Sequence, residues 1–277
     1  MIRIVTDSTS DLSRERREEL NIESLPLSVH FGEETFRDGV DITNREFYER
    51  LAQVETLPTT AQVNPEEFAA LFRKYLDQGD EVVGIFISGA MSGTCQSAAI
   101  ARDMVDGEAH IFIVDSHTVT FALGLLVETA VLLRDQGLSA REIAARIEEL
   151  SGRTRLLAVV DTLKYLKMGG RIRAATAVVG GLLGISPIIT IENGLVESIG
   201  KARGRKAASS GLSGAWRASS PISPSLSPSA TPTPPRRWRS ARPILPTRSP
   251  GPPFWVWISA ASWALMWGPA RQELSTL

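Results

Sequence analysis

Short β-rich runs alternate with helix signals through the first 204 residues, and this alternation constrains the fold more than any other feature. Apolar runs of strand length at residues 2–6, 24–31, 81–88 and 109–115 each lead into a turn and then a helix. Such alternation builds a mainly parallel sheet with helices on both faces. The sequence therefore predicts an α/β architecture.

Capping residues mark several of the expected helix starts. Asn64 precedes a proline and two acidic residues, which suit the first turn of a helix. Near the end of the alternating region, Asn193-Gly194 separates two apolar runs within residues 188–203, which predicts a β-hairpin. Two further pairs have the spacing of a capping box, Thr43 with Glu46 and Ser139 with Glu142.

The composition changes abruptly near residue 205. All six Trp and twelve of the 16 Pro lie beyond Gly204, together with nine basic side chains and a single acid. No helix or strand period is sustained there, and a Pro- and Ser-rich bias is typical of disorder. We expect an N-terminal α/β domain over residues 1–155, the start of a second α/β domain over 156–204, and a disordered tail over 205–277.

The cysteine content and the apolar segments of the chain indicate its cellular localisation. The only cysteine, Cys95, excludes an intrachain disulfide and suits a reducing cytoplasm. No signal peptide is visible at the N-terminus. The apolar run at residues 254–267 has 14 residues, whereas a membrane-spanning helix needs about 20. We expect a cytoplasmic protein without stable membrane insertion.

Polar residues follow the expected strands, where ligands of open α/β sheets collect. The loop ISGAMSGT after the strand at 81–88 places Gly, Ser and Thr at a helix start, where free N–H groups and the helix dipole favour anions. Arg171 follows a turn at Gly169-Gly170 and is a candidate anion clamp. Any one of these residues could equally be a cap or a surface residue. The candidates are Asp7, Ser8, Thr59, Thr60, Gln62, Ser88, Ser92, Gly93, Thr94, Ser116 and Arg171.

The sequence shows no recognisable catalytic or metal-binding set. His30, His110 and His117 lack metal-ligand spacing, and neither HExxH nor GxSxG occurs. We expect no metal and no cofactor. An enzyme stays open as an alternative, namely a hydrolase or phosphotransferase that acts on a small anionic substrate through Ser92 or Ser8.

Several longer motifs follow one another across residues 1–206. They include IVTDSTSDL, LPTTAQVNPEEF, ISGAMSGTCQSA, VVDTLKYLKMGGRI, LLGISPIITIENG and GKARGRK. Taken together and in this order, these motifs resemble the DegV family of bacterial proteins. Two positions depart from the family pattern. Ala61 stands where the family usually has Ser, and SGAMSGT replaces the commoner S-S-x-L-S-G-T, which removes one hydroxyl near residue 89.

The resemblance implies a two-domain protein that holds one long-chain fatty acid in an interior tunnel. It also implies a separate kinase that makes acyl-phosphate from this ligand for phospholipid synthesis, so the chain itself would not be an enzyme. Carried over by position, Thr60, Ser92 and Gly93 would contact the carboxylate. Arg171 would lie near the head group, and Lys201 and Arg203 would face the kinase or the transferred phosphate. We expect a monomer and no nucleic-acid partner.

The family also ends in G-T-H-x-G-P-G, whose His meets the carboxylate, yet no His follows His117 here. Read one nucleotide earlier, the codons for residues 263–270 permit V-G-T-H-V-G-P-G. We therefore hypothesise a one-nucleotide frame change near residues 205–210. One alternative is a genuine Pro/Ser-rich tail, and another is that the chain is an inactive product of a frame-shifted gene.

Overall fold

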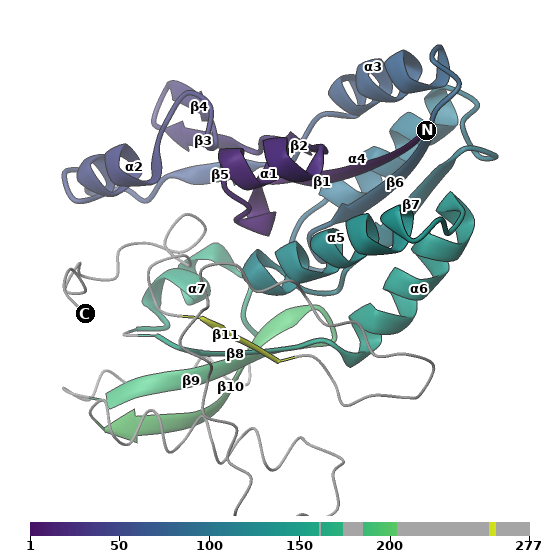
Figure 1. Ribbon diagram of the computed structural model, residues 1–277. Helices are drawn as coiled ribbons and strands as arrows, with labels where there is room; N and C mark the ends of the chain where they lie inside the picture. The colour runs from purple at the N-terminus through teal and green to yellow at the C-terminus, as the bar shows by residue number, and fades with distance from the viewer. Residues whose placement is uncertain (161, 174–184, 204–254, 259–277) are drawn as a thin grey trace, which may run out of the picture.

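The computed structural model describes residues 1–160, 162–173, 185–203 and 255–258, whose strands form three sheets (Figure 1). The first sheet is parallel throughout, and three of its strands confirm the runs expected at 2–6, 81–88 and 109–115. Side chains on both of its faces are buried, which suits strands whose central residues are mostly apolar. In order across the sheet, the strands are β2 (Ile22–Leu25), β1 (Ile2–Asp7), β6 (Glu81–Phe86) and β7 (Ile111–Asp115).

Helices cover both faces of this sheet, as predicted (Figure 1). Phe68 and Phe72 pack against Phe86 on one face, and the other face is covered by a long apolar helix and its neighbour. The expected capping boxes and the Asn64 cap all form. The first face carries α3 (Pro65–Leu76) and α4 (Thr94–Met104), the second carries α5 (Thr120–Asp135) and α6 (Ala140–Arg153), and α1 (Arg14–Leu20) lies beside β2.

A small antiparallel sheet of β3 (Ser28–Phe31), β4 (Glu34–Arg37) and β5 (Thr59–Ala61) packs with α2 (Asn44–Leu51). The single strand that we expected over residues 24–31 is wrong, because β2 ends at Leu25 and β3 belongs to this other sheet. Pro26 has no N–H to give to a ladder. Leu27 donates its N–H to the hydroxyl of Ser8 at 3.1 Å, so the chain leaves the first sheet here.

The third sheet follows the first along the chain and is mixed. Its Asn193-Gly194 turn has φ angles of 49° and 76°, which confirms the predicted hairpin. In order, its strands are β10 (Leu195–Arg203), β9 (Ile185–Glu192), β8 (Arg155–Val159) and β11 (Trp255–Ile258), and α7 (Lys164–Gly169) follows β8.

Strand β11 corrects one expectation about the tail. Residues 205–277 were expected to be disordered, but 255–258 pair in parallel with β8. The run WVWI has high β propensity, and a free sheet edge accepts such a strand. The other residues of the tail, including 263–270, lie outside the described residues.

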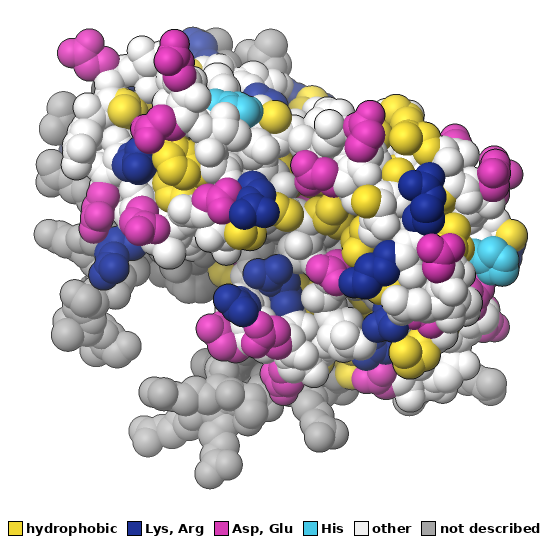
Figure 2. Space-filling view, turned by 90° about the horizontal axis from the view of Figure 1, so that it is seen from above, with side chains coloured by type: hydrophobic (Ala, Val, Ile, Leu, Met, Phe, Trp, Pro, Cys, Tyr) yellow, Lys and Arg dark blue, Asp and Glu magenta, His cyan; other side chains and the backbone are white. Residues whose placement is uncertain are grey.

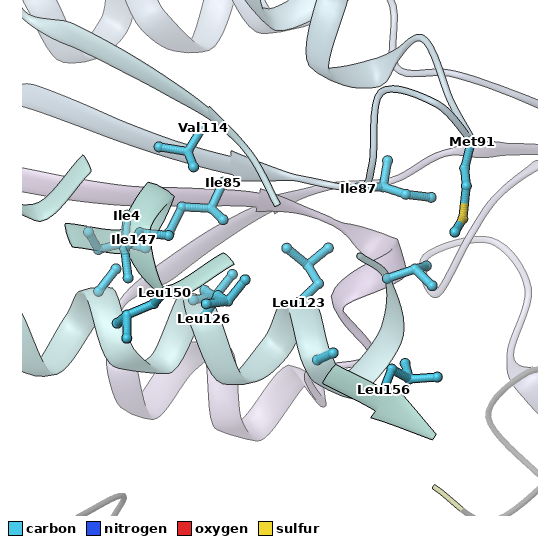
Figure 3. Close-up of a cluster of buried hydrophobic side chains, with 14 of the residues drawn as sticks. Ile4, Ile85, Ile87, Met91, Val114, Leu123, Leu126, Ile147, Leu150 and Leu156 are labelled. Atoms are coloured by element: carbon cyan, nitrogen blue, oxygen red, sulfur yellow. The ribbon is translucent and has the colours of Figure 1, made fainter. Parts of the chain in front are cut away.

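Helix α5 lies between the parallel sheet and the third sheet and joins them into one core (Figure 3). Its Leu123 and Leu126 are fully buried between Ile4 and Ile85 on one side and Leu156 of β8 on the other. The boundary that we placed between residues 155 and 156 falls at the start of β8, and the buried cluster continues across it. Within the described part of the chain, no helix has the length and apolar character needed to cross a membrane.

Candidate ligand-binding site

Two carboxylates at strand ends anchor the loop that leaves β6. We call residues 87–93 the Ser92 loop. Asp7 at the end of β1 accepts a hydrogen bond from the Ile87 N–H at 2.9 Å, and Asp115 at the end of β7 accepts one from the Gly89 N–H at 3.0 Å. Burial raises the pKa of Asp7 to about 6, although hydrogen bonds from Thr9 and Ile87 oppose that rise. The adjacent strand order β1-β6-β7 brings these three loops together.

The third sheet and the turn after α7 hold the same loop from the opposite side. The hydroxyl of Ser88 donates to the Gly194 carbonyl at 2.8 Å, at the turn of the β9–β10 hairpin. Arg171 donates from Nε to the Met91 carbonyl at 3.2 Å and from a terminal nitrogen to the Gly169 carbonyl at 2.6 Å. Arg171 follows Gly170, whose φ of 73° ends α7 in the predicted turn. The Ser92 loop is thus fixed to both large sheets.

The end of the Ser92 loop is the start of α4. Gly93 is the N-cap residue of this 11-residue helix and has no side chain that could accept an N–H of the first turn at its positive end. The hydroxyl of Ser92 lies 2.9 Å from that of Thr94 and accepts the Thr94 N–H at 3.3 Å. Hydroxyl donors at a helix N-terminus are suited to an anion.

A second polar segment faces the Ser92 loop across the cavity. Residues 59–61 form β5, are exposed, and pair with β3, where Thr60 lies opposite Val29. Gln62 follows β5, and its side-chain nitrogen donates to the hydroxyl of Ser97 on α4 at 2.7 Å. This contact brings the end of β5 against the first turn of α4.

Between these segments lies a cavity of about 780 Å³, which is within the range of small-molecule sites. Among the described residues that line it, Arg171 is the only charged side chain, so a negative ligand group meets no carboxylate there. The hydroxyls, the Gln62 amide and the Gly93 backbone supply the polar part. The apolar part comes from Leu27, Val29, Phe47, Leu51, Leu57, Ile87, Met91, Tyr165 and Met168.

The structure divides the residues suggested by the sequence into two groups. Ser8 accepts the Leu27 N–H, Ser116 donates to the Thr118 carbonyl, and Thr94 lies behind Ser92. Those that hold loops without lining the cavity are Asp7, Ser8, Ser88, Thr94 and Ser116. Those that line it are Thr59, Thr60, Gln62, Ser92, Gly93 and Arg171. Lys201 and Arg203 are exposed on β10, outside the lining.

Sequence reasoning missed most of the apolar wall. Phe47 and Leu51, one turn apart on α2, are 2 % and 6 % exposed and line the cavity beside Leu57. Their spacing marks an apolar helix face, but it does not tell a cavity wall from ordinary core. Both departures from the family pattern, Ala61 and Gly89, also line the cavity. A side chain at Gly89 would approach the Asp115 carboxylate to 2.8 Å.

The lining offers little for acid–base chemistry. No His, Asp or Glu is among the described residues that line the cavity, and the partner of the Ser92 hydroxyl is another hydroxyl. Burial raises the pKa of the Cys95 thiol to about 12, and its side chain packs against the hydrophobic core. The described residues contain no cluster suited to a metal ion. The arrangement can hold an anion beside an apolar chain.

This fold and cavity define an α/β protein with an amphipathic ligand site at the carboxyl ends of its strands. The sequence model of the DegV family, described as uncharacterised proteins, matches residues 1–220. The chain belongs to the DegV family.

Relatives and solved structures agree with this assignment. A DegV domain-containing protein of Deinococcus radiodurans is 40% identical over 207 residues, which cover 75% of this chain and 73% of that protein. A fatty-acid-binding DegV family protein from Thermus thermophilus has a TM-score of 0.71 at 37% identity, with 78% of this chain and 77% of that one covered. A stearic-acid-binding protein from Eubacterium ventriosum has a TM-score of 0.72 at 34% identity, with 79% and 76% covered.

Proposed function

We propose that this protein binds one long-chain fatty acid, with the carboxylate at the Ser92 loop and the alkyl chain along the apolar wall. The observation that carries the proposal is the cavity, which combines a helix N-terminus with a glycine N-cap, hydroxyls and one arginine with an extended apolar lining. The fatty-acid-binding structures to which the chain is similar support the same ligand class.

The chemistry of the lining suits both parts of such a ligand. In the proposed complex, the hydroxyls of Thr60 and Ser92 and the backbone N–H of Gly93 donate hydrogen bonds to the fatty-acid carboxylate. Arg171 also donates to it, through the guanidinium N–H groups that do not bind the Met91 and Gly169 carbonyls. Charge-assisted bonds of this kind are stronger than neutral ones. Each buried CH₂ of the alkyl chain contributes about 0.8 kcal/mol, so affinity grows with chain length until the cavity is filled.

Mass spectrometry of lipid extracted from the purified protein tests this proposal. We expect a stoichiometric long-chain fatty acid in the wild type and a loss of about tenfold or more in fatty-acid affinity for Ser92→Ala. Ser198→Ala, which removes a hydroxyl from β10 outside the cavity, is the control and should bind like the wild type. Turnover of a small ester or phosphate ester by the chain alone would instead support the hydrolase or phosphotransferase alternative.

We further infer that the bound carboxylate is the substrate of a separate kinase. In that step, a carboxylate oxygen attacks the γ-phosphorus of ATP, the bond to ADP breaks, and acyl-phosphate forms. Lys201 and Arg203 are exposed on β10, where cations can meet a kinase or a phosphate. Charge reversal at both, Lys201→Glu with Arg203→Glu, should slow acyl-phosphate formation with the partner kinase and leave fatty-acid affinity unchanged.

The frame change near residues 205–210 remains our proposal for the compositional break. Its support is the encodable G-T-H-x-G-P-G over residues 263–270, which would add a histidine to the carboxylate site. Sequencing the coding DNA decides the matter. An extra or missing nucleotide near codon 205 is expected. A clean reading frame whose neighbouring frame does not encode the motif would contradict the proposal, and a histidine-free site that retains no lipid would favour an inactive gene product.

A further inference from the structure

The side chain of Gln62 bridges the two polar segments of the cavity. Its nitrogen donates to the hydroxyl of Ser97 at 2.7 Å, and Ser97 is fully buried in the first turns of α4. The Ser97 N–H in turn donates to the Gly93 carbonyl at 2.8 Å. The amide therefore spans from the end of β5 to the start of the helix that follows Ser92.

The same amide lies directly against the backbone of Gly93. A methyl group added at position 93 would overlap the Gln62 side-chain oxygen and approach its Cδ to 2.7 Å. Gly93 has φ −75° and ψ 3°, and a negative φ of this size does not require glycine. A side chain at this position would therefore displace the Gln62 amide.

Strand β5 has few other attachments. It is three residues long, all three are exposed, and within the described sheets it pairs with β3 alone. Thr60 lies two residues before Gln62, while Ser92 lies next to Gly93. A bridge from Gln62 to the Gly93–Ser97 turn therefore fixes how far Thr60 stands from the Ser92 loop.

We propose that Gln62 is a positioning residue that sets the width of the carboxylate site by bridging β5 to the first turn of α4, with Gly93 as its matched partner. This inference rests on the proposed fatty-acid site. It also assigns Gly93 a second role beside its backbone N–H, because the missing side chain makes room for the bridge.

A double-mutant cycle on the full-length chain tests the pairing, with palmitate affinity and the thermal midpoint as readouts. We expect Gly93→Ala and Gln62→Ala each to weaken palmitate binding about tenfold. Gly93→Ala is expected to act by displacing Gln62. Adding Gly93→Ala to Gln62→Ala should therefore lower palmitate affinity by less than a further twofold. Losses that multiply to about a hundredfold would overturn the proposal. Gln53→Ala, after α2, and Gly152→Ala, whose added methyl group meets no atom of the described residues within 4 Å, are matched controls expected to bind like the wild type.

A charge variant tests whether the amide faces the ligand head group. Gln62→Glu can still accept a hydrogen bond from the Ser97 hydroxyl, but it places a negative charge beside the carboxylate. At pH 8 we expect palmitate binding to fall at least tenfold and 1-hexadecanol binding to change less than threefold. Equal losses for both ligands would contradict a head-group position for Gln62. If the wild type binds neither ligand, the proposed fatty-acid function fails. The Gln62–Gly93 bridge is then tested separately by the thermal midpoints of the double-mutant cycle, because paired residues give a double variant whose loss is smaller than the sum of the two single losses.

Discussion

The two polar sides of the cavity are held in very different ways. The Ser92 loop is fixed by Asp7, by Asp115, by the β9–β10 turn through Ser88, and by Arg171. Strand β5 on the other side is exposed and has one strand partner among the described strands, supplemented by the Gln62 bridge. One side is preorganised by hydrogen bonds from distant segments, two of them buried, whereas the other can change without breaking the core.

This difference indicates a division of labour within the site. Preorganised hydrogen-bond donors raise the affinity for an anion, because less conformational entropy is lost when the ligand binds. Part of the apolar wall lies on the small sheet and α2, through Val29, Phe47 and Leu51. We therefore expect substitutions at these residues to change which alkyl chain fits, without moving the Ser92 loop. On the surface seen from above relative to Figure 1, Lys and Arg side chains are interspersed with Asp and Glu side chains (Figure 2).

Removing the Asp7 carboxylate should give the largest loss of stability, because this carboxylate anchors the Ser92 loop to the end of β1. Asp7→Ala leaves the N–H groups of Ile87 and Thr9 without their acceptor. Buried unpaired donors cost about 1–3 kcal/mol each, so we expect a loss of about 3–5 kcal/mol in the free energy of unfolding. Urea denaturation at pH 7 measures it. Exposed Asp77→Ala is the control, expected within about 0.5 kcal/mol, and a comparably small loss for Asp7→Ala would show that the loop does not depend on this anchor.

The pH dependence of stability should reveal the same buried acids. Burial raises the pKa of Asp7 to about 6 and that of Asp11 to about 8, with repulsion from Asp38 adding to both. Burial also raises the pKa of Asp38, although Ser8 and Arg17 oppose this rise. These groups keep protons in the folded state that the unfolded chain has released, so the free energy of unfolding falls as pH rises from 5 to 8.

At about 1.4 kcal/mol for each pKa unit, Asp7 alone accounts for about 1.4 kcal/mol of this fall, because its folded-state proton is lost near pH 6. Urea midpoints at pH 5, 6, 7 and 8 measure the slope. Asp11→Asn should flatten it, because the amide does not titrate, while exposed Asp77→Asn should leave it unchanged. Stability that rises between pH 5 and 8 would mean that these acids are not held protonated by the fold.

Removing the hydrogen bond between the Ser92 loop and the third sheet should reduce stability by an intermediate amount. Ser88→Ala removes the hydrogen bond to the Gly194 carbonyl and the acceptor for the Ala90 N–H. We expect about 1–2 kcal/mol of destabilisation and a two- to fivefold loss of fatty-acid affinity, since the loop would retain its carboxylate anchors. Calorimetry and ligand titration measure both. A loss as large as that of Ser92→Ala would place Ser88 in direct contact with the ligand instead.

The sequence predicted what depends on local chemistry. Strand ends, helix caps, the hairpin turn and the hydroxyl-rich loop follow from neighbouring residues, and six of the eleven candidate residues line the cavity. The sequence could not separate Ser88 from Ser92 in one loop, because that distinction depends on Gly194, 106 residues away. It also joined β2 and β3 into one strand, because the apolar residues on either side of Pro26 do not show which sheet each half enters.

The smallest stability effect is expected on the opposite side of the cavity, and it should come with a clear effect on binding. Thr60 is exposed on β5 and has no side-chain hydrogen bond in the described part of the chain, so Thr60→Ala should change the free energy of unfolding by less than about 0.5 kcal/mol. Fatty-acid affinity should still fall about three- to tenfold, because one hydroxyl donor to the carboxylate is lost. Thr60→Ser, which keeps the hydroxyl, is the matched control and should restore most of the affinity. Unchanged binding for Thr60→Ala would mean that the Ser92 loop alone holds the carboxylate. A large loss of stability would instead mean that β5 is as firmly integrated as the Ser92 loop, and the contrast between the two sides would fail.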